Sequence, residues 1–186
     1  MIWNRVSTDT VYLTFDDGPH PLATPFVLEQ LAQYQAKATF FCIGKNVEDH
    51  TEIYQQVLDE GHKVGNHSHN HLNGWKTSTE KYIENIELAQ PFIHSNLFRP
   101  PYGRIRKKQA SGITKLGYSI IMWDVLCGDF DVSISPEKCW NNILQNIEPG
   151  SIVVFHDSSK AWDRMRYALP LTLALCQQKG WKMDTL

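Results

Sequence analysis

Short, mostly apolar runs alternate with amphipathic stretches along nearly the whole chain, and this alternation restricts the fold more than any other feature of the sequence. The runs at residues 11–15, 38–43 and 151–155 predict buried strands, and the stretches between runs carry apolar residues at helical spacing. About seven strand–helix alternations predict a parallel sheet with helices outside it. The length of 186 residues fits one domain over residues 1–186 and leaves no room for a second core.

Local signals predict where several of these elements begin and end. Thr24, which precedes a proline, is expected to be a helix N-cap. A single helix is expected over residues 46–60, and Thr77 and Glu80 have the spacing of a capping box. Ser135 is expected to cap a later helix. Further strands are expected at residues 62–66, 96–98, 118–123 and 181–184.

The composition is that of a globular protein, with 42% hydrophobic and 20% charged residues, which excludes disordered and coiled-coil chains. Lys and Arg number 18 and Asp and Glu number 20, so the net charge of −2 offers no excess of positive charge to bind nucleic acid. The four cysteines form no Cys-x-x-Cys pair and are expected to be reduced and buried.

The sequence contains no membrane segment, because no apolar run reaches the roughly 20 residues that a membrane helix needs. The first ten residues also lack the charged start and apolar stretch of a signal peptide. A monomer is expected. The expected location is the cytoplasm, or the cell envelope if an N-terminal export or anchor segment has been removed.

Ionisable side chains gather where the predicted strands end, which is where active sites of α/β folds lie. Asp16 and Asp17 follow the first strand, and His156 follows the strand at residues 151–155. Adjacent carboxylates repel each other unless a cation lies between them, although an Asx-type turn could also explain the pair. Four of the eight histidines fall within residues 62–71, a density that favours a metal site over structural histidines.

The backbone conformation decides which of these histidines could bind a metal. A strand would place His67, His69 and His71 on one face, whereas a helical turn would bring together only His67 and His71. Because Asn70 and Gly74 argue against a continuing strand, we expect His67 and His71 to bind together with one carboxylate, and His69 to face solvent at the rim. Two histidines and one aspartate leave positions open for water, as in catalytic sites, and are compatible with zinc.

Five motifs occur in a fixed order: Thr-Phe-Asp-Asp-Gly-Pro from Thr14, His-Ser-x-x-His from His67, Arg-Pro-Pro-Tyr-Gly from Arg99, Asp-Phe from Asp129, and Val-x-His-Asp from Val154. Together they resemble the polysaccharide deacetylases, carbohydrate esterase family four, over about residues 9–186. The resemblance implies a distorted (β/α) barrel of about seven units. It also implies metal-dependent removal of N- or O-linked acetyl groups from sugars.

The resemblance further implies roles for the residues that match. Asp17, His67 and His71 would bind a divalent metal, with zinc expected and cobalt, nickel or manganese as alternatives. Asp16 would act as general base on a water activated by this metal, and His156 would act as general acid toward the departing group.

The remaining motif residues would position these groups or the substrate. The Tyr102 backbone N–H would help to hold the oxyanion, and Asp129 would keep His156 cationic. Arg99 would line the groove and hold a carboxylate, expected to be that of Asp16. The residues expected to contact the substrate are Pro101, Tyr102, Phe130 and Val154.

One motif departs from the family, where it reads Asp-x-x-Asp-Trp: Leu126 replaces the first Asp and Phe130 replaces the Trp. The motifs therefore define the substrate preference less closely than they define the type of reaction. The expected substrate is an acetylated polysaccharide or oligosaccharide such as chitooligosaccharide or peptidoglycan, and the small net charge fits a neutral one. Two alternatives remain, a non-catalytic carbohydrate-binding barrel and a metallohydrolase of a non-sugar amide. An open groove with aromatic walls would favour a polymer, and a closed pocket a small amide.

Overall fold

A computed structural model describes residues 1–186 of the chain. Its strands form one sheet in the spatial order β5-β4-β3-β2-β1-β7-β6, in which every pairing is parallel. The eighth strand, β8, pairs with the start of β1. The strands are β1 (Thr10–Asp16), β2 (Thr39–Cys42), β3 (Lys63–Asn66), β4 (Leu97–Phe98), β5 (Ser119–Ile120), β6 (Val125–Leu126), β7 (Ile152–His156) and β8 (Lys182–Met183).

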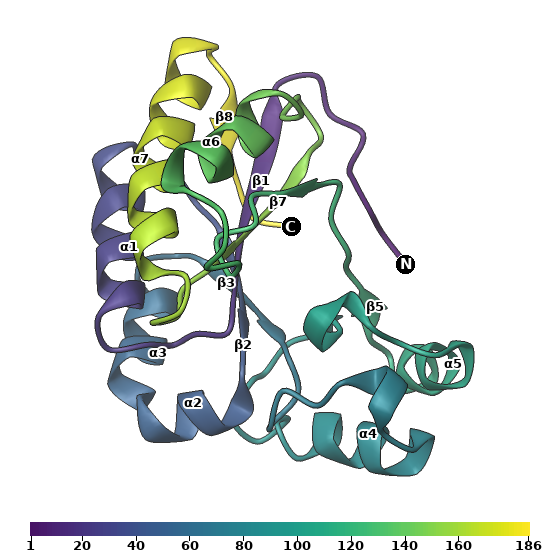
Figure 1. The fold of residues 1–186 in the computed structure, drawn as a ribbon. Helices are drawn as coiled ribbons and strands as arrows, with labels where there is room; N and C mark the ends of the chain where they lie inside the picture. The colour runs from purple at the N-terminus through teal and green to yellow at the C-terminus, as the bar shows by residue number, and fades with distance from the viewer.

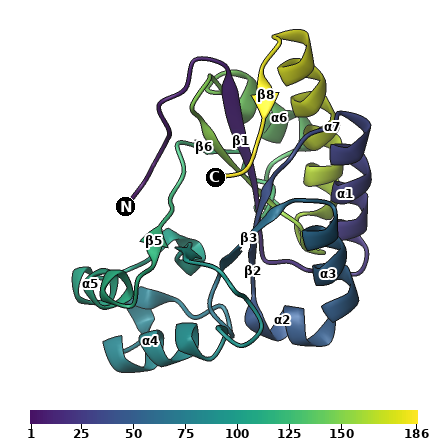
Figure 2. The same ribbon diagram turned by 180° about the vertical axis from the view of Figure 1, so that it is seen from behind.

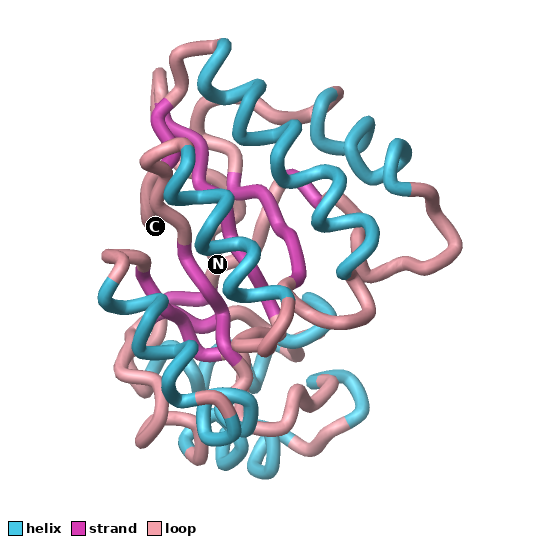
Figure 3. Tube along the Cα trace, turned by 90° about the vertical axis from the view of Figure 1, so that its left-hand side faces the viewer, coloured by secondary structure: helices cyan, strands magenta, loops and turns pink.

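Helices surround this sheet. They are α1 (Ala23–Gln33), α2 (Gly44–Asp49), α3 (Thr51–Asp59), α4 (Thr79–Glu87), α5 (Lys107–Lys115), α6 (Pro136–Leu144) and α7 (Trp162–Gln178), with 3-10 turns η1 (Gly74–Lys76) and η2 (Pro101–Gly103). In both Figure 1 and Figure 2, α1, α3 and α7 lie together beside β1, and α4 and α5 form a second group on the far side of β3. Figure 3 shows helices packed in front of the strands. The arrangement confirms the expected distorted (β/α) barrel.

Strand pairing does not close the barrel, because β5 and β6 stand at opposite ends of the strand order. The N-terminal segment lies beside the chain that leaves β5, where Ile2 forms a parallel bridge with Ile121. The Ile2 N–H donates to the carbonyl of Ile120 at 2.9 Å, and its own carbonyl accepts from the Met122 N–H at 2.6 Å. The outer edge of β5 is therefore covered by residues from the start of the chain.

Side-chain caps were predicted correctly at one helix and wrongly at two. The Ser135 side chain accepts from the Lys138 N–H at the start of α6, as expected. The Thr24 cap is wrong: Thr24 lies inside α1, and its hydroxyl donates to Asp157 instead. The capping box at Thr77 is also wrong, because Ser78, one residue later, caps α4.

The helix expected over residues 46–60 is divided into α2 and α3. His50 has φ −136° and ψ 48°, which is not helical, and it separates the two elements. The Thr51 hydroxyl bonds to the Val47 carbonyl at 3.0 Å, in the place where the Thr51 N–H would bond in a continuous helix. This local side-chain bond competes with the helical pattern.

The strand expected at residues 118–123 is only the two residues of β5, and β6 was not expected. The chain beyond β5 pairs with Ile2 as an isolated bridge. Further along the chain, the Asp124 side chain accepts a hydrogen bond from the Ile152 N–H at 2.7 Å. A carboxylate thus takes the place of the backbone carbonyl that would accept this bond between two paired strands. Contacts with residues distant in the sequence therefore set these short strands.

The core lies between the sheet and the helices, and three phenylalanines of neighbouring strands stack at its centre. The ring centroid of Phe15 in β1 is 5.0 Å from that of Phe40 in β2 and 5.7 Å from that of Phe155 in β7. All four cysteines are buried and free, as expected. None of the helices combines the length and the apolar character that crossing a bilayer requires.

Replacing Phe15 by alanine is expected to reduce the free energy of unfolding by about 3–5 kcal/mol, because it leaves a cavity between two aromatic neighbours. Denaturant titration followed by circular dichroism measures this loss. Val6→Ala is the matched control, since the Val6 side chain is fully exposed and should change the value by less than about 0.5 kcal/mol. Equal losses in the two variants would contradict the proposed core.

Candidate active site

Asp16 and Asp17 stand at the carboxyl end of β1, where three strands end at the same level. The register places Asp16 opposite His156 of β7 and level with the end of β2. Asp16 is buried, and its Oδ1 accepts a hydrogen bond from Arg99 Nη1 at 2.8 Å. Asp17 is half-buried, with a left-handed φ of 82°. The neighbouring carboxylates thus have different surroundings.

The two histidines expected to bind a metal lie in the loop that follows β3. His67 Nδ1 is 2.8 Å from the Arg99 carbonyl oxygen, which leaves Nε2 to face the end of β1. Left-handed φ angles at Ser68 (62°) and His71 (54°) turn the chain so that the two imidazole centroids lie 5.0 Å apart. The helical turn expected here is wrong: this loop brings the two rings together.

Asp17, His67 and His71 form a compact group of metal-ligand atoms. Asp17 Oδ1 lies 3.2 Å from His71 Nε2 and 3.7 Å from His67 Nε2, and one ligand atom from each residue lies within 4.8 Å of the others. Burial acts to raise the pKa of Asp17, but the contact with His71 and the charges of His156 and His67 hold it well below its usual value. Burial lowers the pKa of His67 to about 4, so this imidazole is neutral at pH 7.

This donor set fits a divalent metal. Asp17 Oδ1 is buried and has no hydrogen-bond partner, since the 3.2 Å contact with His71 lacks hydrogen-bond geometry. A buried, ionised oxygen without a donor is costly unless a cation satisfies it. One carboxylate and two neutral imidazoles are ligands that zinc and related divalent ions accept.

His69 lies outside this group. Its ring centroid is 5.7 Å from that of Phe92, and its Nδ1 is only 2.7 Å from the position that a Cβ on Gly44 would occupy. The ring is half-buried, and Nδ1 is buried without a partner. His69, expected to be a solvent-facing or rim residue, is therefore only partly exposed and packs against Gly44 of α2 and Phe92.

Arg99 holds Asp16, but it lies beneath the groove and not along it. Its side chain is fully buried, with the guanidinium carbon 4.1 Å from the centre of the Phe41 ring. Nη1 donates to Thr14 Oγ1 at 2.7 Å as well as to Asp16, and Nη2 donates to the Met122 carbonyl at 3.0 Å. The guanidinium therefore fixes one oxygen of Asp16 from the interior of the barrel.

His156 ends β7 and is held by Asp129. His156 Nδ1 lies 2.7 Å from Asp129 Oδ1, and the His156 backbone N–H donates to Asp129 Oδ2 at 2.7 Å. Burial acts to lower the pKa of His156, but the charge and hydrogen bond of Asp129 outweigh it and raise the pKa to about 9. Because Nδ1 contacts Asp129, Nε2 is the imidazole nitrogen of His156 that remains available. The Phe130 ring lies edge-on to the imidazole, with centroids 5.1 Å apart.

Whereas Phe130 lies against His156, Tyr102 lies against His71, beside the metal-ligand group. Its ring is 59% exposed, and its centroid lies 4.5 Å from that of His71. The backbone is left-handed at Tyr102 (φ 61°), within a turn where Gly103 and Arg104 donate to Pro100 and Pro101. No backbone carbonyl accepts from the Tyr102 N–H.

Val154 lies on β7 two residues before His156, so both side chains are on the same face of the strand. It is buried and pairs in register with Thr14 of β1 and Leu126 of β6. Pro101, also expected to contact substrate, is buried at the start of η2.

Asp157, for which no role was predicted, lies next to His156 and contacts the loop after β1. Its Oδ1 accepts from the Gly18 N–H at 3.0 Å, and its Oδ2 accepts from the Thr24 hydroxyl at 2.5 Å. A Cβ on Gly18 would lie 2.1 Å from Asp157 Oδ2, so only glycine fits there. Burial raises the pKa of Asp157 to about 8. Asp157 thus fixes the loop that carries Asp17, and its place at the end of the Val-x-His-Asp motif was the signal in the sequence.

Replacing Asp129 by asparagine is expected to lower the pKa of His156 from about 9, because the variant lacks the charge that most strongly opposes the effect of burial, while Asp16 and Asp17 still raise the pKa. In the parent protein the raised pKa stabilises the fold fully below pH 6.5, and this contribution is lost as the pH rises through about 9. NMR titration of the imidazole in metal-free protein measures the shift. An unchanged pKa in the variant would show that Asp129 does not hold the imidazolium.

The chain shares sequence and structure with known enzymes. The family model described as polysaccharide deacetylase matches residues 4–121. The chain is 35% identical over 182 residues to a peptidoglycan-N-acetylglucosamine deacetylase of Bacillus cereus, covering 95% of this chain and 85% of that protein. It is 36% identical over 199 residues to a chitooligosaccharide deacetylase of Azorhizobium caulinodans, covering 95% and 92%.

Among solved structures, the Bc1960 peptidoglycan N-acetylglucosamine deacetylase superposes with a TM-score of 0.89 at 30% identity, covering 100% of this chain and 90% of that one. The match thus extends over the entire barrel and includes each loop described above. Together with the family model, it shows that the chain belongs to the polysaccharide deacetylases of carbohydrate esterase family four, a family of metal-dependent carbohydrate deacetylases.

Proposed function

We propose that this protein removes N-acetyl groups from an acetylated glycan, with a zinc ion held by Asp17, His67 and His71, Asp16 as general base and His156 as general acid. The observation that carries the proposal is the buried, unpartnered Asp17 Oδ1 beside two imidazoles. Relatives that act on peptidoglycan N-acetylglucosamine and on chitooligosaccharide support an acetamido sugar as the substrate.

The ligand residues favour zinc on chemical grounds. Two imidazoles and one carboxylate are a common set for catalytic zinc, and cobalt, nickel or manganese accept the same donors. When bound, a divalent ion supplies Lewis acidity, which polarises the acetyl carbonyl and makes water a stronger acid. All of these groups come from one chain, so we also propose that the protein acts as a monomer.

Asp16 is suited to accept a proton from the attacking water. Arg99 holds its Oδ1 at 2.8 Å, whereas Oδ2 lies 4.0 Å from His67 Nε2, at the edge of the ligand group. The guanidinium keeps the carboxylate in one orientation with its second oxygen directed toward the reacting atoms. A base fixed in this way contributes about 10²–10⁴ in rate.

His156 is suited to give a proton to the departing sugar nitrogen. Asp129 occupies Nδ1, so Nε2 carries the proton that can be transferred, and a pKa of about 9 keeps the imidazole charged at pH 7. Asp16 and His156 are paired in the sheet register, so the base and the acid stand side by side across the two strand ends.

The walls of the site suit a polymer. The Tyr102 N–H is free to hold the oxyanion, while Val154 and Pro101 would border the acetyl methyl group. The Tyr102 and Phe130 rings are 59% and 37% exposed, one beside His71 and the other beside His156, so they could form the aromatic walls that binding of a polymer requires. Phe130 offers a stacking surface without the N–H donor that a tryptophan would have.

The Asp16→Asn and His67→Ala variants are expected to lose activity for different reasons. Asp16→Asn should retain the metal and lose about 10²-fold or more in kcat, because the base is absent while the ligands remain. His67→Ala should lose the metal itself. Isothermal titration with zinc and measurement of acetate release separate the two effects. Normal turnover by Asp16→Asn would contradict its role as base.

The wild-type protein is expected to release acetate from N-acetylated glycans when zinc or cobalt is supplied and to stop when the metal is chelated. Acetate should be measured with chitooligosaccharide, peptidoglycan and acetylxylan, and with a small aryl acetate. Re-addition of metal after chelation is the control for irreversible damage. An absence of metal-dependent release from all four substrates would overturn the proposed function.

A further inference from the structure

Two loops leave the metal-ligand group side by side, one after His71 and the other after Tyr102. The rings of His71 and Tyr102 are in contact where the two loops begin, with their centroids 4.5 Å apart. Further out, the buried Gln109 joins the loops: its Nε2 donates to the Gly74 carbonyl at 2.9 Å, and its Oε1 accepts from the Arg106 N–H at 2.8 Å. The loops therefore form one fixed surface that begins at the site.

The outer part of this surface consists of Trp75, Arg104 and Arg106, which we call the Trp75 strip. The Trp75 side chain is 55% exposed, and the Arg104 guanidinium lies 4.7 Å from the centre of its ring. Arg106 Nη2 donates to the Trp75 carbonyl. Neither arginine has a carboxylate within 4 Å. The Arg104 guanidinium thus covers one face of the exposed indole, and both arginines keep N–H donors that no carboxylate occupies.

The stretch of chain that carries Arg104 and Arg106 has charges of only one sign. No aspartate or glutamate occurs between Glu87 and Asp124, a stretch that contains Arg99, Arg104, Arg106, Lys107, Lys108 and Lys115. Arg99 is buried against Asp16, and the other five are exposed. The acids of the neighbouring α4, Glu80, Glu84 and Glu87, form no ion pair with them. Although the net charge of the chain is −2, the segment from Arg104 to Lys115 is therefore positively charged.

We propose that the Trp75 strip is a subsite for a carboxylate-bearing sugar next to the sugar that is deacetylated, so that the enzyme prefers acidic glycans to neutral ones. The inference rests on the proposed function and names its substrate class. Guanidinium groups bind carboxylates through paired N–H donors, and indole rings stack on the apolar faces of sugars. A neutral glycan would use only the indole.

The opposite wall gives this preference a direction. Phe130 is followed there by Asp131, whose pKa is lowered by hydrogen bonds from Ser133, so it is ionised at pH 7. Lys160 and Arg164 lie near this carboxylate, so the Phe130 side carries charges of both signs, whereas Arg104 and Arg106 make the Trp75 strip positive. A carboxylate on the substrate would therefore be placed toward the strip.

The test compares two oligosaccharides of alternating N-acetylglucosamine and N-acetylmuramic acid, one with free lactyl carboxylates and one with these converted to primary amides. The measured quantity is the ratio of kcat/KM for the acidic oligomer to that for the amidated one. This ratio should exceed one, and should fall about five- to twentyfold in the Arg104→Gln/Arg106→Gln double variant. Rising salt should lower it in the wild type.

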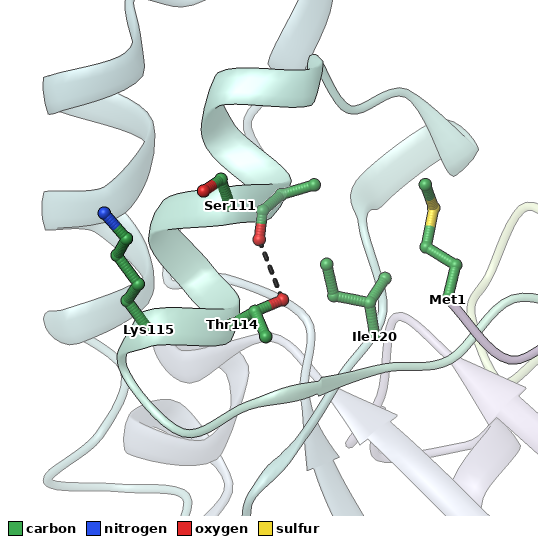
Figure 4. Close-up of a pocket in the computed structure, with 6 residues that line it drawn as sticks. Met1, Ser111, Thr114, Lys115 and Ile120 are labelled. Atoms are coloured by element: carbon green, nitrogen blue, oxygen red, sulfur yellow. Dashed lines mark hydrogen bonds between the residues drawn. The ribbon is translucent and has the colours of Figure 1, made fainter.

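Lys115→Gln is the matched control, because it removes one exposed cation at the C-terminal end of α5, about 12 Å along the axis from the end that adjoins Arg106. Figure 4 shows Lys115 with Ser111, Thr114, Ile120 and Met1, around a separate cavity of about 380 Å³. The ratio should not change in this variant. An equal fall would mean that general surface charge, and not the strip, sets the preference, and would overturn the inference.

The failure of the two proposals can be distinguished. A ratio of one in the wild type, with acetate released from both oligomers, overturns the inference and leaves the deacetylase function intact. If neither oligomer yields acetate, binding of the two oligomers measured by calorimetry decides: tighter binding of the acidic one, lost in the double variant, supports the strip. Equal binding of both overturns it.

Discussion

The guanidinium of Arg99 connects parts of the barrel that strand pairing does not join directly. Arg99 follows β4, yet its donors reach Thr14 and Asp16 on β1 and the carbonyls of Ile121 and Met122 beyond β5. Four hydrogen bonds, one of them to the Asp16 carboxylate, compensate for burying this charge, and breaking such an ion pair typically costs about 3–5 kcal/mol. One side chain therefore stabilises the open sheet and also fixes an oxygen of Asp16.

The other groups that are proposed to take part in the reaction are likewise each held by a residue of another element. Asp129 orients His156, and its own carbonyl accepts from Arg164 Nε on α7 at 2.7 Å. Asp157 holds the Gly18 amide, and Asn46 of α2 donates to the Asp17 carbonyl at 2.7 Å. The site is preorganised by buried hydrogen bonds, so little reorganisation is needed when charge develops.

Long buried strands and chemically distinctive residues could be predicted from the sequence, whereas features set by distant contacts could not. β1 and β7 were located to within a residue or two because their apolar runs are continuous. β6 was missed because two residues carry no periodic signal. His67 and His71 were paired through an incorrect helical turn, since residue spacing cannot reveal left-handed angles at Ser68 and His71.

The bridge between Ile2 and Ile121 has a consequence for self-association. The residues beyond β5 would otherwise present a free carbonyl at Ile120 and a free N–H at Met122, both at the open edge of the sheet. Unpaired strand edges are templates on which a second chain can add a strand and begin to aggregate. By pairing with these groups, a single residue near the start of the chain removes one place at which a second chain could add a strand to the open sheet.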